Sequence, residues 1–259
     1  NNSMAYSNSD IGIQMDVNGP ISLNNVKASY NTSYGAWLMN YSAQGVTILN
    51  GIYNNNGDSG AYIRTTGNVL MNHIEAGNNG DYGVLIGLRP DAVVTEAASS
   101  VTLLNTLGMN WFTYNGFDGL QVNASAVVSL TGVNALFNMG DGVDVITTGA
   151  VTMLNSQLEY NRYHGVSASS GGLMNFNTFR SYNNGYDVYT DSFIGGYDGA
   201  HLTAANGSIT FINSALSSNG GSGIEADINL LSGYNLFLVN TTYYGNNMED
   251  GGYPDIDKY

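Results

Sequence analysis

The 259-residue sequence contains no cysteine, only 3 prolines, and only 6 lysines and arginines against 20 aspartates and glutamates. The absence of cysteine excludes disulfide bonds and thiolate metal sites. A formal net charge of −14 with so few cations argues against nucleic acid and anionic membrane surfaces as partners. No run of about 18 apolar residues is present, so no membrane insertion is expected. Cations, neutral glycans and protein surfaces are the partner classes that remain.

What the sequence does contain is a repeat rich in glycine and asparagine. With so little proline, the 34 glycines are typical of turns in an ordered repeat. An apolar run ending in Asn, a second Asn about six residues later, and a Gly that opens an alternating run recur about nine times. One copy consists of Val151–Asn155, Asn161 and Gly165. A repeat of this length predicts a stacked solenoid.

Aligning the copies gives three columns of equivalent residues. The Asn that ends the first run gives a predicted ladder of stacked side chains: Asn50, Asn72, Asn105, Asn155, Asn213 and Asn240. The second column comprises Asn31, Asn56, Asn78, Asn115, Asn138, Asn161, Asn183, Asn219 and Asn246. The glycine column comprises Gly35, Gly60, Gly83, Gly119, Gly142, Gly165, Gly185, Gly223 and Gly252. Stacked amides hydrogen-bond along a ladder, and Asn and Gly tolerate the left-handed backbone of sharp corners.

The residues after each glycine alternate with a period of two, which predicts strands. We therefore expect an all-β fold, a right-handed parallel β-helix of about nine coils with Asn ladders. It forms a single domain over 1–259, with coils over roughly 11–250 and short terminal segments at 1–10 and 251–259. Two longer coils predict loops at 87–98 and 190–201, and loops of this kind often carry function in solenoids.

This motif resembles the right-handed parallel β-helix repeat of the pectate-lyase-like superfamily. Copies such as Ile21–Ser29 look like the repeat regions of large secreted bacterial surface proteins. The superfamily includes lyases, hydrolases, epimerases, phage tailspikes and adhesins, so the resemblance implies a fold without implying one activity. Together with the low charge and the absence of cysteine, it favours a secreted or cell-surface protein.

A polysaccharide-active enzyme is one of two functional hypotheses. The residue before each glycine places Asp118, Asp141 and His164 on successive coils, as carboxylate chemistry on a glycosidic bond requires. The order resembles that of polygalacturonases. However, Gly140-Asp141-Gly142 lacks the second Asp of the family's pair, and Tyr163-His164-Gly165 lacks the first Gly of its Gly-His-Gly motif. A non-enzymatic protein is therefore the favoured interpretation.

The favoured hypothesis is a structural or adhesive solenoid. Its ends would be covered by other copies in a head-to-tail filament, or the chain would be a segment of a larger surface protein. Lateral contacts between copies are also expected, because Trp37 and Tyr62 point outward, and these aromatic rings suit glycan stacking. With Asp144, they are the expected ligand-binding residues.

No cofactor and no metal site are expected, with Ca²⁺ as the exception. His73 and His201 stand alone in the sequence. Carboxylates that suit Ca²⁺ occur at two places: Asp187, Asp191 and Asp198, and the tail residues Glu249, Asp250, Asp255 and Asp257.

Overall fold

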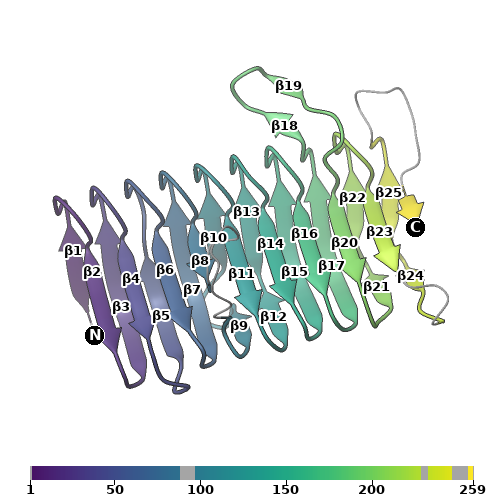
Figure 1. The fold of residues 1–259 in the computed structure, drawn as a ribbon. Helices are drawn as coiled ribbons and strands as arrows, with labels where there is room; N and C mark the ends of the chain where they lie inside the picture. The colour runs from purple at the N-terminus through teal and green to yellow at the C-terminus, as the bar shows by residue number, and fades with distance from the viewer. Residues whose placement is uncertain (1, 88–96, 229–232, 247–255, 259) are drawn as a thin grey trace.

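The computed structural model describes residues 2–87, 97–228, 233–246 and 256–258. The described residues contain strands and turns and no helix, and the chain forms a parallel β-helix of about ten turns (Figure 1). The expected all-β solenoid is therefore confirmed. Among the described residues, no helix is long and apolar enough to cross a membrane.

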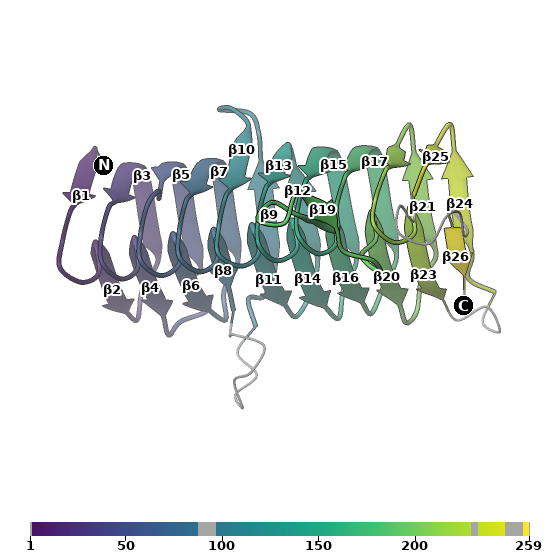
Figure 2. The same ribbon diagram turned by 90° about the horizontal axis from the view of Figure 1, so that it is seen from above.

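Two parallel sheets face each other across the core (Figure 2). The 14-stranded sheet, sheet A, consists of β1 (Ser3–Tyr6), β3 (Ile21–Ser29), β5 (Val46–Ile52), β7 (Val69–Gly77), β9 (Val101–Leu104), β10 (Asn110–Thr113), β12 (Val128–Thr131), β13 (Val133–Leu136), β15 (Val151–Glu159), β17 (Met174–Tyr182), β21 (Ile209–Ile212), β22 (Ala215–Ser217), β24 (Leu236–Val239) and β25 (Thr242–Tyr244). The 10-stranded sheet, sheet B, consists of β2 (Ile13–Val17), β4 (Ala36–Asn40), β6 (Ala61–Thr65), β8 (Val84–Ile86), β11 (Leu120–Ala124), β14 (Val143–Thr147), β16 (Val166–Ser170), β20 (Ala200–Ala204), β23 (Ile224–Ile228) and β26 (Ile256–Lys258).

The alternation of the sequence places every second strand residue in the core. Val143 and Val145 of β14 are fully buried, and Asp144 between them points outward. Val143 lies opposite Val166 of β16, so apolar residues stack on their equivalents from turn to turn. A one-residue slip would turn this apolar set to solvent, and the core therefore fixes the register.

The continuous Asn ladder runs through the second Asn column and not through the column we predicted. From Asn138, the backbone N–H and Nδ2 both donate to Oδ1 of Asn161, at 3.1 and 2.9 Å. The pattern repeats along Asn8, Asn31, Asn56, Asn79, Asn115, Asn138, Asn161, Asn184, Asn219 and Asn246. Asn79 and Asn184 replace the expected Asn78 and Asn183, which instead adopt left-handed backbone at φ of 55° and 53°.

The residues of the predicted ladder have other structural roles. Four of them adopt the left-handed backbone conformation within or beside the strands of sheet A, with φ between 48° and 54°: Asn50, Asn155, Asn213 and Asn240. Asn72 instead donates from Nδ2 to Thr106 Oγ1 at 2.7 Å, and Asn105 lies against Met109. Within this column, Nδ2 of Asn240 donates to Oδ1 of Asn213 at 2.8 Å. A residue in the left-handed corner points its side chain away from the core, so the column cannot form a buried ladder.

The second predicted loop lies a few residues earlier than expected. Residues 185–198 form the insertion, with the antiparallel hairpin of β18 (Tyr186–Asp187) and β19 (Ser192–Phe193) standing out from the rod (Figure 1). The corner glycine of this turn is Gly199, because Ala200 of β20 pairs with Val166 of β16. Gly185 begins the insertion with φ of 77°. Of the first predicted loop, residues 88–96 lie outside the described residues.

The solenoid also reaches further toward both ends than the repeat indicated. Ser3–Tyr6 pair in parallel with β3, within the segment predicted to be terminal. Ile256–Lys258 pair in parallel with β23. The predicted boundaries at residues 11 and 250 are therefore too narrow for the solenoid.

Candidate functional site

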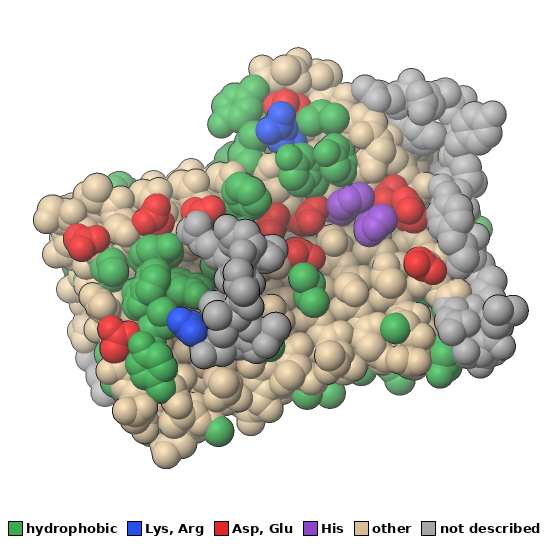
Figure 3. Space-filling model, viewed as in Figure 1, with side chains coloured by type: hydrophobic (Ala, Val, Ile, Leu, Met, Phe, Trp, Pro, Cys, Tyr) green, Lys and Arg blue, Asp and Glu red, His purple; other side chains and the backbone are tan. Residues whose placement is uncertain are grey.

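A band of acidic side chains and histidines crosses the outer face of sheet B (Figure 3). It is built from two neighbouring columns. The residues before the corner glycine are Asp118, Asp141, His164, Asp198 and Ser222, and the second residues after it are Gln121, Asp144, Ser167, His201 and Glu225. Both columns follow from the repeat, because each turn contributes one residue at each position.

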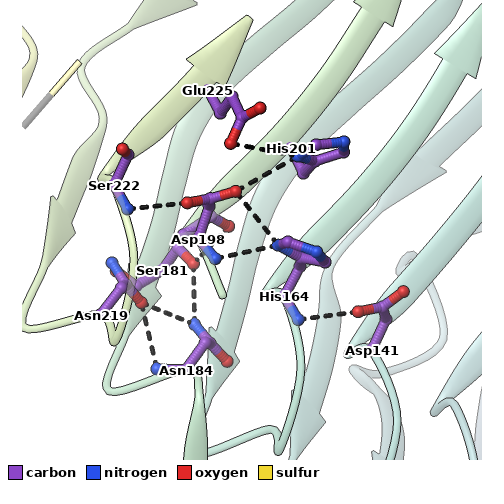
Figure 4. A network of polar contacts seen from close by, with 10 residues as sticks. Asp141, His164, Ser181, Asn184, Asp198, His201, Asn219, Ser222 and Glu225 are labelled. Carbon is purple, nitrogen blue, oxygen red and sulfur yellow. Dashed lines mark hydrogen bonds and ion pairs between the residues drawn. The ribbon is translucent and has the colours of Figure 1, made fainter. Parts of the chain in front are cut away.

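The first column is also a chain of hydrogen bonds between turns. Asp141 donates its backbone N–H to Asp118 Oδ1, and His164 donates its own to Asp141 Oδ1, each at 2.7 Å. The backbone N–H of Asp198 donates to Nδ1 of His164 at 2.9 Å (Figure 4). The structure therefore brings the predicted Asp118, Asp141 and His164 together, and it uses one acceptor of each to hold the next turn.

Burial and like charge shift the carboxylates at the start of the band. Burial raises the pKa of Asp118 to about 7, with a further contribution from the charge of Asp144. Burial, and then the charges of Asp118 and Asp144, raise the pKa of Asp141 well above its usual range. Burial also raises the pKa of Asp144, against the hydrogen bond that Gln121 Nε2 donates to its Oδ2 at 2.6 Å. The surroundings of all three carboxyl groups therefore shift their pKa values upward.

The other end of the band holds a carboxylate that favours the ionised form. Burial would raise the pKa of Asp198, but its contacts with His164 and His201 outweigh burial and lower that pKa. The contact with Asp198 raises the pKa of His201, against the effect of burial. Nδ1 of His201 lies 3.2 Å from Asp198 Oδ2 and 3.6 Å from Glu225 Oε2. The same face of the rod therefore raises the pKa of the carboxyl groups at one end of the band and lowers the pKa of Asp198 a few turns away.

The grouping of His164, Asp198 and His201 was missed by the sequence analysis, which placed His201 in a loop and treated it as isolated. The misplaced insertion is the reason. The signal was present, because Gly199-Ala200-His201-Leu202 has the same pattern as Gly165-Val166-Ser167-Ala168. His73 lies elsewhere, with Nδ1 3.0 Å from Asn50 Oδ1.

The carboxylates considered for Ca²⁺ do not share one site. Asp187 pairs with Arg162 at 3.3 Å, Asp191 accepts a hydrogen bond from Tyr186, and Asp198 contacts the histidines. In the tail, Glu249, Asp250 and Asp255 lie outside the described residues, and Asp257 is described only as part of β26.

The predicted aromatic ligand-binding residues pack against each other on the outer face of sheet B. Trp37 and Tyr62 have ring centroids 4.8 Å apart, and Tyr62 is only 7% exposed. Tyr82 and Leu85 are buried in the same cluster. The two rings point away from the solenoid core, as expected, but Tyr62 offers little surface to a ligand.

A different set of aromatic residues borders an open hollow of about 590 Å³. The side chains that line it include Asn55, Asn78, Tyr114, Phe137, Met139 and Tyr189. Tyr114, Phe137 and Tyr160 stack with ring centroids 4.9 and 5.0 Å apart and interplanar angles of 7° and 6°. Tyr189, from the hairpin, is 80% exposed. We call this region the aromatic hollow.

The hairpin that borders the aromatic hollow is held at its base. Arg162 Nη2 lies 3.3 Å from Asp187 Oδ2 in β18. The rings of Tyr186 and Tyr160 meet edge to face at 5.7 Å, and Tyr186 also packs against Phe193 of β19. The insertion therefore separates two surfaces, since the aromatic hollow lies at its start and the histidines lie at its end.

A scan against protein-family models found no match to this chain, and searches of the curated proteins and of the solved structures also found none.

Proposed function

We propose that this protein is a non-enzymatic structural and adhesive β-solenoid of an extracellular surface, and that the aromatic hollow binds neutral glycans. The observation that carries the proposal is the flat stack of Tyr114, Phe137 and Tyr160 beside an amide-lined hollow. Sugar rings present apolar C–H faces that pack on aromatic rings, and their hydroxyls hydrogen-bond to amides. Among the described residues, no charged side chain lines the hollow, which favours a neutral ligand.

Glycan binding is tested on an array with two variants that keep the backbone. Tyr114→Asn removes a ring at a left-handed position (φ 56°) that Asn tolerates, and Tyr189→Ala removes the exposed ring of the hairpin. We expect both to lose binding to glycans that the wild type retains. Tyr41→Ala, which removes a ring that is 59% exposed elsewhere, is the control and should bind normally. An array without bound glycans would refute the adhesive role.

The structural role is supported by the N-terminal end of the rod. Met15 of β2 is only half-buried, whereas Leu38, its partner one turn further, is fully buried. Ile13 and Met15 border a hollow of about 310 Å³ that reaches the core at Leu23 and Val26. Apolar residues of an edge turn are normally covered, and a further turn of β-helix, from a second copy or from a longer stretch of the same protein, fits this surface.

Electron microscopy of the purified protein tests this head-to-tail contact. We expect rods longer than one molecule, and Met15→Lys should shorten them because the cation enters the apolar contact. Single rods for the wild type at every concentration would contradict self-association.

A second candidate, polysaccharide cleavage, is favoured by one observation. Asp118 has a pKa raised to about 7, as suits a general acid, and Asp141 on the next turn supplies a second carboxyl group about 5 Å away along the rod, which is the spacing of the carboxyl pair in retaining glycosidases. Release of reducing ends from a panel of acidic polysaccharides, with Asp118→Asn and Asp141→Asn beside the wild type, tests it. Equal rates for all three proteins would remove these residues from consideration.

A further inference from the structure

Three metal-binding side chains converge at the end of the insertion (Figure 4). Asp198 is the last residue of the insertion, His164 precedes the corner of the turn before it, and His201 lies on β20. One ligand atom from each lies within 4.8 Å of the others. Glu225 of the next turn approaches the same histidine, with Oε2 3.6 Å from His201 Nδ1.

The spacing of these atoms fits ligands of one small ion. Asp198 Oδ2 lies 3.3 Å from His164 Nδ1 and 3.2 Å from His201 Nδ1. Two ligands that each bind an ion at about 2.1 Å, at angles near those of a tetrahedron, lie roughly 3–3.5 Å apart. Oδ2 of Asp198 therefore already stands at a ligand-to-ligand distance from each of the two histidines.

The hydrogen bonds define which nitrogen of His164 faces the carboxylate of Asp198. Nδ1 of His164 accepts the backbone N–H of Asp198 at 2.9 Å, so it carries no proton. The same nitrogen faces Asp198 Oδ2 at 3.3 Å, and a carboxylate oxygen is also an acceptor. To bind an ion, Nδ1 would exchange the hydrogen bond from Asp198 for the bond to the metal, because an imidazole nitrogen has one lone pair, and Oδ2 of Asp198 would supply a carboxylate oxygen to the same ion.

The remaining contacts hold the carboxylate in place. Asp198 Oδ1 accepts the backbone N–H of Ser222 at 2.7 Å, which leaves Oδ2 directed at the histidines. Partners of this kind orient ligands in metal sites. The side chain of Asp198 is 2% exposed and that of His201 is 41% exposed, so the site is anchored in the rod and open to solvent on one side.

We infer that His164, Asp198 and His201 bind a divalent transition-metal ion of the zinc class at the surface of the solenoid, with Glu225 as a further oxygen ligand. Two imidazoles and carboxylates suit zinc, whereas Ca²⁺ takes six to eight oxygen ligands. The ion would connect Asp198, at the end of the insertion, to ligands on the turns on both sides. Tyr197 already packs edge to face on His164, with ring centroids 5.3 Å apart.

Zinc and cobalt titrations of the protein, after removal of metal with a chelator, test the site. Calorimetry should show one zinc ion per chain, and cobalt should give the visible absorption of a low-coordinate histidine site. We expect His201→Ala and Asp198→Asn to weaken zinc binding by about 100-fold or more. Bound zinc should also protect the hairpin from proteolysis.

His73→Asn is the matched control, because it removes a histidine on another turn and keeps a left-handed position at φ 58°. It should bind zinc like the wild type. If Asp198→Asn does not fold, the partly exposed His201→Ala and Glu225→Gln variants still decide. Absence of zinc binding by the wild type, or binding undiminished in His201→Ala, would overturn the inference.

Discussion

The two halves of sheet B carry different chemistry at one structural position. In the second position after the corner, the first half of the rod has Trp37, Tyr62 and Leu85, packed into a small apolar cluster. The second half has Asp144, Ser167 and His201 in the same register. The backbone pairing and the inward residues are alike in both halves.

This difference shows that inward and outward positions of the repeat have separate roles. Inward positions such as Leu38 and Val145 are fully buried and specify the core. Outward positions do not enter the core, so they can gather rings at one place and titratable groups at another. Substitutions in a feature that both halves share should change stability by similar amounts in each half. Substitutions at outward positions should change stability by different amounts in the two halves.

The largest expected effect comes from the ladder, which both halves share. Asn161→Ala removes four buried hydrogen bonds. Oδ1 of Asn161 accepts two bonds from Asn138, and Nδ2 of Asn161 donates one bond to Ala135 O and one to Asn184 Oδ1. We expect a loss of more than about 3 kcal/mol of unfolding free energy, with a similar loss for Asn56→Ala in the first half. Urea unfolding measures both. Asn175→Ala is the control, because its buried Oδ1 has no hydrogen-bond partner.

The outward column should respond unequally in the two halves. Tyr62→Ala empties a position that is 7% exposed and should cost about 3 kcal/mol. Ser167→Ala, four turns further along the same column, should cost less than about 1 kcal/mol. Thermal unfolding of the two variants compares them, and equal costs would show that the apolar cluster does not stabilise its half.

The titratable half should make stability depend on pH. The folded pKa of Asp118, about 7, exceeds its unfolded value near 4, so the folded state binds more protons between these values. Stability is therefore expected to fall as the pH rises from about 4 to about 7. His201, whose pKa is raised, adds a loss above about pH 6.5.

Urea unfolding near pH 5 and near pH 8 measures this dependence. Asp118→Asn should reduce the difference between the two pH values, and the exposed Asp16→Asn of the first half should leave it unchanged. A protein equally stable at both pH values would contradict the assignment of a protonated Asp118.

The smallest effect concerns the left-handed corner of sheet A. Thr178 adopts φ of 53°, which is costly for a β-branched residue, and the preceding turn has Asn155 at the equivalent position. Thr178→Asn should stabilise the protein by about 1 kcal/mol, and Asn155→Thr should destabilise it by a similar amount. Calorimetric melting temperatures test the pair, and shifts of the same sign would disprove the explanation.

Periodicity was sufficient to predict the strands and the core. Alternation after Gly142 puts Val143 and Val145 on the same face of a strand, and both are buried. The ladder was predicted in kind and misplaced in position. Asn78 and Asn79 are neighbours of equal chemistry, and only the backbone decides which one turns the corner and which one enters the ladder.

The site was harder to predict because it depends on an insertion. Elsewhere the corner glycine lies four residues after the ladder Asn, as Gly142 does after Asn138, but the insertion separates Asn184 from Gly199, so the local pattern assigned the corner to Gly185 instead. The short pattern Gly199-Ala200-His201-Leu202 also suits a corner, and only the long-range pairing of Ala200 with Val166 decides between the two glycines. Asp118 and Asp141, on turns without an insertion, were placed correctly side by side.

The Asn ladder also gives the rod a direction. In every pair the N–H groups lie on the N-terminal partner and the carbonyl oxygen on the C-terminal one, so all the carboxamide dipoles point the same way and add along the axis. Like an arrow, the molecule has a head and a tail that differ electrically. Rods that join through their ends would share one heading, and a fibre made from them would have two unlike tips.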